Sequence, residues 1–424
     1  MSIRSRGTLL HGDRKRRELA LRAFELGLES ISPDQLMRSS VQFKRNEFVV
    51  RGHPFPVGRV FVIGFGKASG AMAETFERLV PVTSGIVIVP KGTRKRFRTK
   101  KIQLLEGTHP FPSKENVSAT QKILALASEV TKEDVVVCLI SGGGSSLLTL
   151  PREGLSLKDV QRISEGLMRG GASISELNEV RRCLSQVKGG QLGLAFKNAK
   201  IVNLVLSDVV HGSLADIASG PTVSSTHHYQ RARLLLKRYL HLSSNDPIMK
   251  TLMRFPSKQS VRVSSHSFVL GDNNTVIDAA SSFLRRQGMR PWVFRGLTGD
   301  ARDHGKRFAN LLNRNLTFVA GGETTVTVSG NGIGGRNQEL CLSALSWLKN
   351  GVLLSAGTDG IDGSSPSAGA IVDSSTNDRA SKKRLKPAKY LKNNDSHSFL
   401  KKTGDVIVTG PTGTNACDIV IGIA

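Results

Sequence analysis

The stretch VVVCLISGGGSSLL, residues 135–148, decides the fold class. Its six leading apolar residues, three of them consecutive valines, predict a strand buried on both faces, as in the parallel sheet of an α/β protein. The glycines that follow permit backbone angles closed to other residues, so successive N–H groups can converge on a phosphate or carboxylate. An ordinary tight turn is the alternative interpretation. The candidate anion-binding residues of this loop are Ser141, Gly142, Gly143, Gly144, Ser145 and Ser146.

A second strand, glycine loop and helix precede this stretch. An apolar strand runs into GFGKASG at residues 64–70, and a helical pattern follows. This order is typical of phosphate- and dinucleotide-binding units. The glycine spacing is one residue longer than the nicotinamide fingerprint, and the next strand ends at Lys91 instead of an acid, which disfavours NAD and leaves NADP open. Gly64, Gly66 and Lys67 are candidate phosphate ligands, with a solvated loop lysine as the alternative for Lys67.

The length of 424 residues exceeds what one compact core usually reaches and predicts two domains. A polar, proline-containing stretch at residues 241–260 separates two series of strands and helices, so the predicted domains are 14–240 and 261–424. In the second series, the alternating pattern after residue 316 predicts a hairpin with Glu323 in its turn.

Composition constrains the compartment and the partners. No apolar run is long enough to span a bilayer, so no membrane partner is expected. The four cysteines lie far apart in the sequence, which argues against a zinc site or disulfide framework and favours a reducing compartment. We expect a cytoplasmic protein. Arg4 and Arg6 precede the first acidic residue, which leaves mitochondrial import as the alternative.

The chain is strongly basic. Its net charge is +26, and seven of the eleven residues at 91–101 are Lys or Arg. Such a run can attract anionic substrates, bind nucleic acid or form a solvated loop. It contains one aromatic residue, Phe97, so the stacking partners that a single-strand binder needs are scarce. We therefore expect anion attraction or a solvated loop, and we do not expect nucleic acid as a partner.

Two further stretches carry basic candidates. Gly189 and Gly190 end a helix whose Arg181 and Lys188 either face a ligand or cover surface, and Lys188 is kept as a candidate anion ligand. Arg336, in GIGGRNQE, stands at the N-terminal turn of a helix, where a cation is electrostatically unfavourable unless an anion lies beside it. Arg336 is thus a candidate phosphate or carboxylate clamp, with a surface arginine as the alternative.

Acidic residues follow several predicted strands. Asp208 comes directly after an apolar strand, at the position where open α/β sheets bind ligands. Asp359 and Asp362, in the glycine turn TDGIDG, suit magnesium or a hydroxyl proton acceptor. A helix cap and an Asx turn are the structural alternatives. His109, in a proline-rich turn, is interpreted as a turn residue. The last loop, TGPTGTN, adds the anion-binding candidates Thr412, Gly413, Thr414 and Asn415.

The order of these motifs resembles one family. The motifs occur in the order typical of glycerate 2-kinases, whose C-terminal part is called the MOFRL domain. They are GFGKASG, ISGGGSSLL, VRRCLSQVKGGQL, GGRNQE, TDGIDG and TGPTGTN. The resemblance covers the chain from about residue 14 onward. It implies two three-layer α/β/α domains, the first Rossmann-like, with the active site in the cleft between them. It also implies phosphorylation of the 2-hydroxyl of D-glycerate by ATP, with a need for Mg²⁺.

The resemblance implies key roles for Lys67 and Arg336, and the chemistry of phosphoryl transfer assigns roles to the other candidates. Lys67 and Arg336 would neutralise the transferring phosphoryl group, and Asp208 or Asp359 would orient the substrate hydroxyl. Asp208, Asp359 and Asp362 are the candidate metal ligands, and Lys188, Glu323 and Asn337 join the candidate substrate-binding residues. Relatives usually carry an acid near the position of Gly212 and another near Ser367, and this chain lacks both.

Two alternative functions and several details remain open at this stage. An NAD(P)H-dependent hydroxypyruvate reductase would use the glycine loop for a cofactor, and a non-enzymatic nucleic-acid binder would use the basic run. The sequence does not tell which glycine loop holds ATP and which holds glycerate. It is compatible with a homo-oligomer.

Overall fold

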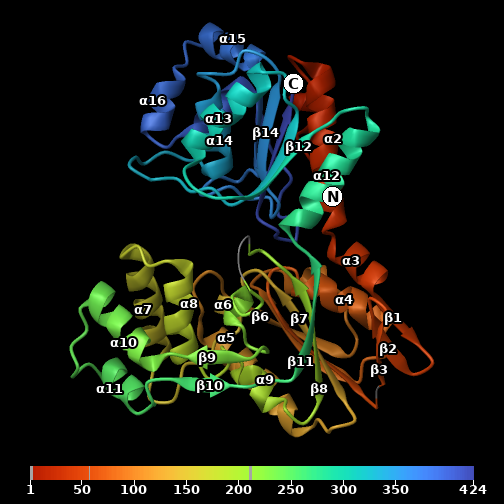
Figure 1. Ribbon diagram of the computed structural model, residues 1–424, viewed down its shortest axis with the longest axis vertical. Coiled ribbons are helices and arrows are strands. Elements are labelled where there is room, and N and C mark those ends of the chain that lie inside the picture. The colour runs from red at the N-terminus through yellow and green to blue at the C-terminus, as the bar shows by residue number, and fades with distance from the viewer. Residues whose placement is uncertain (1–2, 57, 210–212) are drawn as a thin grey trace. The chain divides into compact units, whose positions relative to one another are not determined.

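The computed structural model describes residues 3–56, 58–209 and 213–424 (Figure 1). The chain divides into two compact units. The N-terminal unit comprises Leu36–Ser207 and, among the described residues, 213–270. The C-terminal unit comprises Gly271–Ala424, the stretch before Leu36, and Asp208. No described helix combines the length and apolar character needed to cross a membrane.

The N-terminal unit contains a six-stranded sheet whose central strand is the stretch that decides the fold. Every residue of β7 (Val135–Ser141) is buried, as predicted. Its pairings with both neighbours are parallel. Helix α4 (Ser69–Leu79) packs against β4, β5 and β7, and α5 (Lys114–Ala125) packs against β5 and β6 (Figure 1). The strand order is β11 (Ser265–Gly271), β8 (Lys200–Leu206), β7, β4 (Val60–Phe65), β5 (Ser84–Pro90) and β6 (Ile102–Gly107).

A helical lobe with its own core extends this unit. Leu167, Val180 and Leu236 are fully buried among its helices. The lobe therefore fixes the position of the helix that carries Arg181. Its helices are α7 (Leu157–Arg169), α8 (Ile174–Cys183), α10 (Tyr229–Leu240) and α11 (Pro247–Met253), beside the strand pair β9 (Ser225–His227) and β10 (Gln259–Val261). A small antiparallel sheet consists of β1 (Val41–Lys44), β2 (Glu47–Val50) and β3 (His53–Pro56).

The C-terminal unit contains a mixed sheet. Only β12 and β13 pair in parallel, and the other pairings are antiparallel. Figure 1 shows α2 and α12 on one face of the sheet and α13 and α14 on the other. The strand order is β12 (Trp292–Leu297), β13 (Phe318–Gly322), β17 (Asp418–Ile423), β14 (Val352–Gly357), β15 (Gly369–Asp373) and β16 (Val406–Ile407). The helices of the two faces are α2 (Arg14–Ser30), α12 (Asn273–Arg286), α13 (Ala301–Asn313) and α14 (Arg336–Ala344).

The remaining helices are short. They are α1 (Arg6–Leu9), α3 (Pro33–Ser40), α6 (Gly144–Leu147), α9 (Gln191–Ala195), α15 (Ser374–Lys382), α16 (Pro387–Lys392) and α17 (Ser396–Thr403), with single 3₁₀ turns at η1 (Arg94–Arg96), η2 (Leu126–Ser128) and η3 (Ile217–Ser219).

The structural division differs from the predicted boundaries of 14–240 and 261–424. Helix α2 was expected to open the N-terminal domain, yet it packs against α12, β14 and β17 of the C-terminal unit. Its fully buried Arg17 donates to Asp373 (2.6 Å) and Asp405 (2.8 Å). A buried charge requires such partners, so this ion-pair network fixes the helix to that sheet. At the other boundary, β11 adds an edge to the N-terminal sheet instead of opening the second domain.

The predicted hairpin around Glu323 is wrong. After β13 the chain does not turn back, because it continues alongside the segment that follows β12. The N–H of Glu323 donates to the Leu297 carbonyl (2.8 Å), and that of Thr325 donates to the Gly299 carbonyl (2.8 Å). The alternating pattern therefore reflects one extended segment, bridged in parallel at Asp300 and Thr325.

Candidate active site

The two predicted glycine loops lie side by side in the N-terminal unit. They follow β4 and β7, which are neighbouring parallel strands. The Lys67 N–H donates to the Gly142 carbonyl (2.9 Å), and the Ala68 N–H donates to Ser141 Oγ (3.0 Å). A side chain at Gly66, whose φ is +137°, would place its Cβ 2.2 Å from Ser141 Oγ. Glycine at position 66 is thus required by the contact between the loops.

Several loop residues that were predicted to bind an anion instead form contacts within the protein. Ser145 Oγ lies 3.1 Å from Ser219 Oγ, and Ser146 Oγ donates to the Pro110 carbonyl (2.6 Å). Gly64 belongs to β4, where a Cβ would approach the Leu139 carbonyl to 2.9 Å. The oxygens of Ser141 and Gly142 join the loops. These contacts hold the loop backbone in place, and the first N–H groups of α6 have no partner within that short helix.

Lys67, Gly143 and His109 lie close together beside the loops. Gly143 has a φ of +83°, and a Cβ there would lie 3.4 Å from Lys67 Cγ and 3.2 Å from His109 Nε2. The sequence predicts only a turn at His109, and its place beside the two loops was not expected. One signal could have found it: it follows the carboxyl end of β6, a strand of the same parallel sheet.

Lys188 contacts the backbone of the glycine loop that follows β7. Its Nζ donates to the carbonyls of Ser145 (2.7 Å) and Leu148 (2.6 Å), at the two ends of α6. Burial, and then the positive charge of Arg181, lower the pKa of Lys188 to about 7. Lys188 was predicted to bind an anion, but it donates two hydrogen bonds to backbone carbonyls. These contacts are those of a residue that positions α6.

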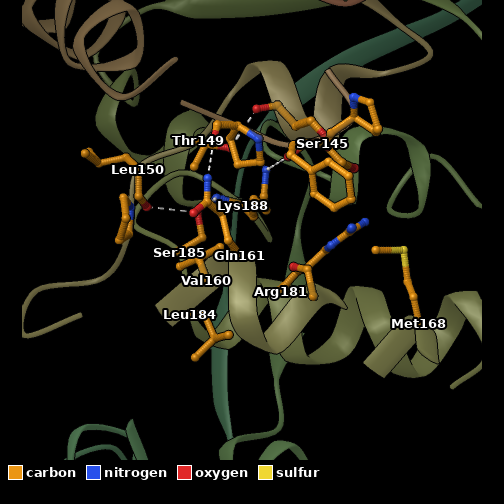
Figure 2. A pocket seen from close by; sticks show the side chains of 16 residues that line it. Ser145, Thr149, Leu150, Val160, Gln161, Met168, Arg181, Leu184, Ser185 and Lys188 are labelled. Atoms are coloured by element: carbon orange, nitrogen blue, oxygen red, sulfur yellow. Dashed lines mark hydrogen bonds between the residues drawn. The ribbon is translucent and has the colours of Figure 1, made fainter. Parts of the chain in front are cut away.

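A small pocket borders α6 on the side of the helical lobe (Figure 2). It has about 30 Å³ of space for water-sized groups. Arg181, in the last turn of α8, lines the pocket together with Lys188, and in Figure 2 no dashed line reaches its guanidinium. The polar lining residues include Ser145, Ser146 and Ser164.

In the C-terminal unit, Arg336 is held by two carboxylates. Its Nε and Nη2 donate to the two oxygens of Asp418 (2.5 and 3.1 Å), and its Nη1 donates to Glu323 (2.6 Å). Burial alone would lower the pKa of Arg336, but the charge and hydrogen bonds of Asp418 and the charge of Glu323 raise it. The bidentate pairing predicted for an anionic ligand is thus made with Asp418. Asp418 was not predicted as a site residue, because it lies in an otherwise apolar strand.

The motifs GGRNQE and TDGIDG pack together and orient the helix that carries Arg336. Asp362, which is buried, accepts from the N–H groups of Asn337 (3.0 Å) and Gln338 (2.9 Å) and from both of their side-chain amides. Burial raises the pKa of Asp362 to about 6. Asn337 also accepts from Ser355 Oγ (2.6 Å). Asp362 therefore caps α14, and these contacts leave it poorly placed to ligate a metal.

The remaining acidic candidates border the TGPTGTN loop. Asn415 Nδ2 donates to Asp208 (3.4 Å), and the Thr412 N–H donates to the Asp359 carbonyl (3.2 Å). A Cβ at Gly357 would lie 3.4 Å from carboxylate oxygens of both Asp359 and Asp418. These acids thus gather at one end of β14 and β17.

Two residues of the TGPTGTN loop that were predicted to bind an anion lie in different surroundings. Thr414 is buried and donates to the Ile31 carbonyl (3.2 Å), whereas Gly413 borders open space. Among the described residues, no three His, Cys, Asp or Glu side chains are grouped to hold a metal ion. Gly212, one of the positions where relatives carry an acid, lies outside the described residues.

Comparison with known proteins finds matches in both parts of the chain, and the first match begins within α2. Residues 19–253 match the family model described as "Domain of unknown function (DUF4147)", and residues 316–418 match that of the MOFRL family. D-glycerate 2-kinase of Thermotoga maritima is 35% identical over 423 residues, covering 96% of this chain and 98% of that protein. A putative hydroxypyruvate reductase of Agrobacterium vitis is 35% identical over 384 residues, covering 86% and 98%.

The solved structures agree with the sequence matches. The crystal structure of glycerate kinase from Thermotoga maritima superposes with a TM-score of 0.85 at 34% identity, covering 96% of this chain and 98% of that one. Identity at this level over nearly the full length of both chains establishes common descent, and the expected α/β fold is confirmed. The chain therefore belongs to the glycerate 2-kinase family, with a DUF4147 domain followed by a MOFRL domain.

Proposed function

We propose that this chain transfers the terminal phosphoryl group of ATP to the 2-hydroxyl of D-glycerate. The observation that carries the proposal is the pair of hydrogen-bonded glycine loops, one of which carries Lys67, in a chain related over nearly its whole length to a D-glycerate 2-kinase. Phosphoryl transfer needs positioning and charge compensation more than covalent chemistry. The ammonium of Lys67, on a glycine loop held in place by the neighbouring loop, would supply both.

The C-terminal unit supplies a second, oriented cation. Asp418 grips the Nε and Nη2 edge of Arg336, which fixes the plane of the guanidinium. Asp418 is thus a positioning residue for Arg336. Asp208 or Asp359 accepts a hydrogen bond from the substrate hydroxyl and so orients it for attack.

The acidic residues fit a Mg²⁺ ion that ATP itself carries. Mg²⁺ usually keeps several waters and binds through one or two carboxylates plus substrate phosphates. The C-terminal unit offers Asp208 and Asp359 for this purpose, since Asp362 is used as a helix cap. When bound, the ion would supply charge neutralisation at the phosphates.

Hydroxypyruvate reduction is the alternative activity. The name of the Agrobacterium relative favours it, but β5 ends at Pro90, followed by Lys91, and so offers no acid for the ribose of NAD. A coupled assay separates the two activities. We expect ADP release that requires D-glycerate and is abolished by a metal chelator. NADPH oxidation by hydroxypyruvate, insensitive to the chelator and without ADP release, would overturn the proposal.

A further inference from the structure

The pocket beside α6 contains an arginine whose surroundings differ from those of its neighbours. Arg182 donates to the Ala215 carbonyl (2.7 Å) and to Asp216 (3.0 Å), and Arg152 donates to the Cys183 carbonyl (2.8 Å). Arg181 has no hydrogen bond or ion pair to any residue within the described ranges. It is partly buried, and burial lowers its pKa. A guanidinium withdrawn from water without a partner is costly, so the site favours an anion.

The pocket has the electrostatics of an anion site. Its described lining contains two basic residues, Arg181 and Lys188, and no Asp or Glu. Lys188 already donates to two carbonyls. Arg181 is therefore the cation that can offer a planar pair of N–H donors, the geometry that matches a carboxylate.

The size and walls of the pocket select a small ligand. A cavity of about 10–15 Å³ holds one water, so 30 Å³ accommodates two or three groups of that size. This is room for a carboxylate, with the adjoining 2-hydroxyl left outside the pocket, and it is too little for a nucleotide. Hydroxyl-bearing Ser164 and apolar Phe111 and Met168 line the same space, which suits a short polar acid with a carbon backbone.

We infer that this pocket binds the carboxylate of a small 2-hydroxy acid, with Arg181 as its ion-pair partner. The inference rests on the proposed function, because D-glycerate is such an acid. It assigns the acceptor substrate to the lobe side of the glycine loop at Ser145 and Ser146, and leaves the Lys67 side to ATP. Lys188 holds the loop backbone between the two sides.

The test compares Arg181→Gln with Arg169→Gln. Arg169 is an exposed residue at the end of α7 that does not line the pocket, so each variant removes one positive charge from the same lobe. We expect the KM for D-glycerate to rise about 10- to 100-fold in Arg181→Gln, the range of a lost charge-assisted hydrogen bond. The KM for ATP should not change, and Arg169→Gln should match the wild type. Arg181→Lys should give an intermediate KM.

Calorimetry without nucleotide keeps this inference separable from the proposed function. D-glycerate and D-lactate should bind the wild-type protein and should bind the Arg181→Gln protein more weakly. Glycerol lacks the carboxylate and should bind neither the wild-type protein nor the variant. If the wild type binds these acids through Arg181 but releases no ADP, the pocket stands and the kinase proposal fails. If it phosphorylates D-glycerate and Arg181→Gln leaves glycerate affinity unchanged, or raises the KM for ATP instead, the inference is overturned. Matching thermal melts of the variants exclude misfolding.

Discussion

The two units surround their cationic residues in opposite ways. In the N-terminal unit, Arg181 faces a pocket whose lining contains no Asp or Glu. In the C-terminal unit, Arg336 contacts two carboxylates, so that cluster carries one net negative charge. Arg181, which has no partner among the described residues, attracts an anion, whereas the doubly paired Arg336 is held in orientation. The contrast supports the proposal that the N-terminal unit binds anionic groups and that the C-terminal unit contributes an oriented cation and carboxylates.

Replacing Lys67 with Ala should have the largest effect on catalysis. We expect kcat to fall about 10²- to 10³-fold, the usual cost of removing one preorganised group that stabilises transition-state charge. The melting temperature should change little, because Lys67 is only partly buried and does not belong to the apolar core. Steady-state kinetics and thermal melts check both points. A kcat within twofold of wild type would show that the N-terminal loop does not hold the phosphoryl group.

Replacing Asp418 with Asn should have the next largest effect. The neutral amide loses the bidentate grip on Arg336, so we expect kcat to fall about 10- to 100-fold, as for a strong charge-assisted hydrogen bond, with both KM values unchanged. Glu323→Gln is the matched control. The side chain of Glu323 is 48% exposed against 6% for Asp418, so its loss should cost only a few-fold.

A double-mutant cycle shows whether Asp418 acts through Arg336. Asp418→Asn should cause little further loss in an Arg336→Ala background, because the positioned group is already absent. Full additivity of the two losses would mean that Asp418 acts independently of the arginine and would remove the contrast between the units.

Lys188→Met should alter the pH dependence of stability. The pKa of Lys188 is lowered from 10.5 to about 7 in the folded state, so the unfolded chain binds one more proton between those values. Its contribution to the free energy of unfolding therefore decreases as pH falls from about 10 to 7 and is constant below 7. The variant should be less stable, since two buried carbonyls lose their donor, and its melting temperature should vary less over this range. Parallel slopes for both proteins would contradict the depressed pKa.

The basic run at residues 91–101 should have the smallest effect. Its backbone is tied down, since Glu74 accepts from the Arg98 N–H (3.0 Å) and Glu106 from the Arg94 N–H (3.2 Å), while most of its basic side chains are exposed. Neutralising Arg94, Lys95, Arg96 and Arg98 together should lower kcat/KM a few-fold at low salt and leave kcat unchanged. The same comparison at high salt should show no difference. An equal effect at both ionic strengths would argue against anion attraction.

The N-terminal sheet and both glycine loops could be predicted because their signal is local. A run of valines followed by glycines specifies a buried strand and a turn with few alternatives. The apolar face of α2 was equally clear, but periodicity does not tell which sheet a helix covers. Burial of Arg17 between Asp373 and Asp405 decides that question, and only the folded chain brings those acids together.

The roles of polar residues were harder to predict for the same reason. Asp362 and Asp359 stand three residues apart in one glycine turn, yet Asp362 caps α14 whereas Asp359 borders the loop at Thr412. Asp418 carries no motif at all. Arg181 could be named as a candidate, but its lack of a protein partner is a property of the packed lobe.

The identity of the phosphorylated product tests the central claim most directly. Phosphorus and carbon NMR of the wild-type protein with Mg²⁺, ATP and D-glycerate should show ADP and 2-phosphoglycerate accumulating together, and the Lys67→Ala protein should form neither at a comparable rate. Absence of any phosphorylated glycerate, with hydroxypyruvate reduced when NADPH is supplied, would contradict the account.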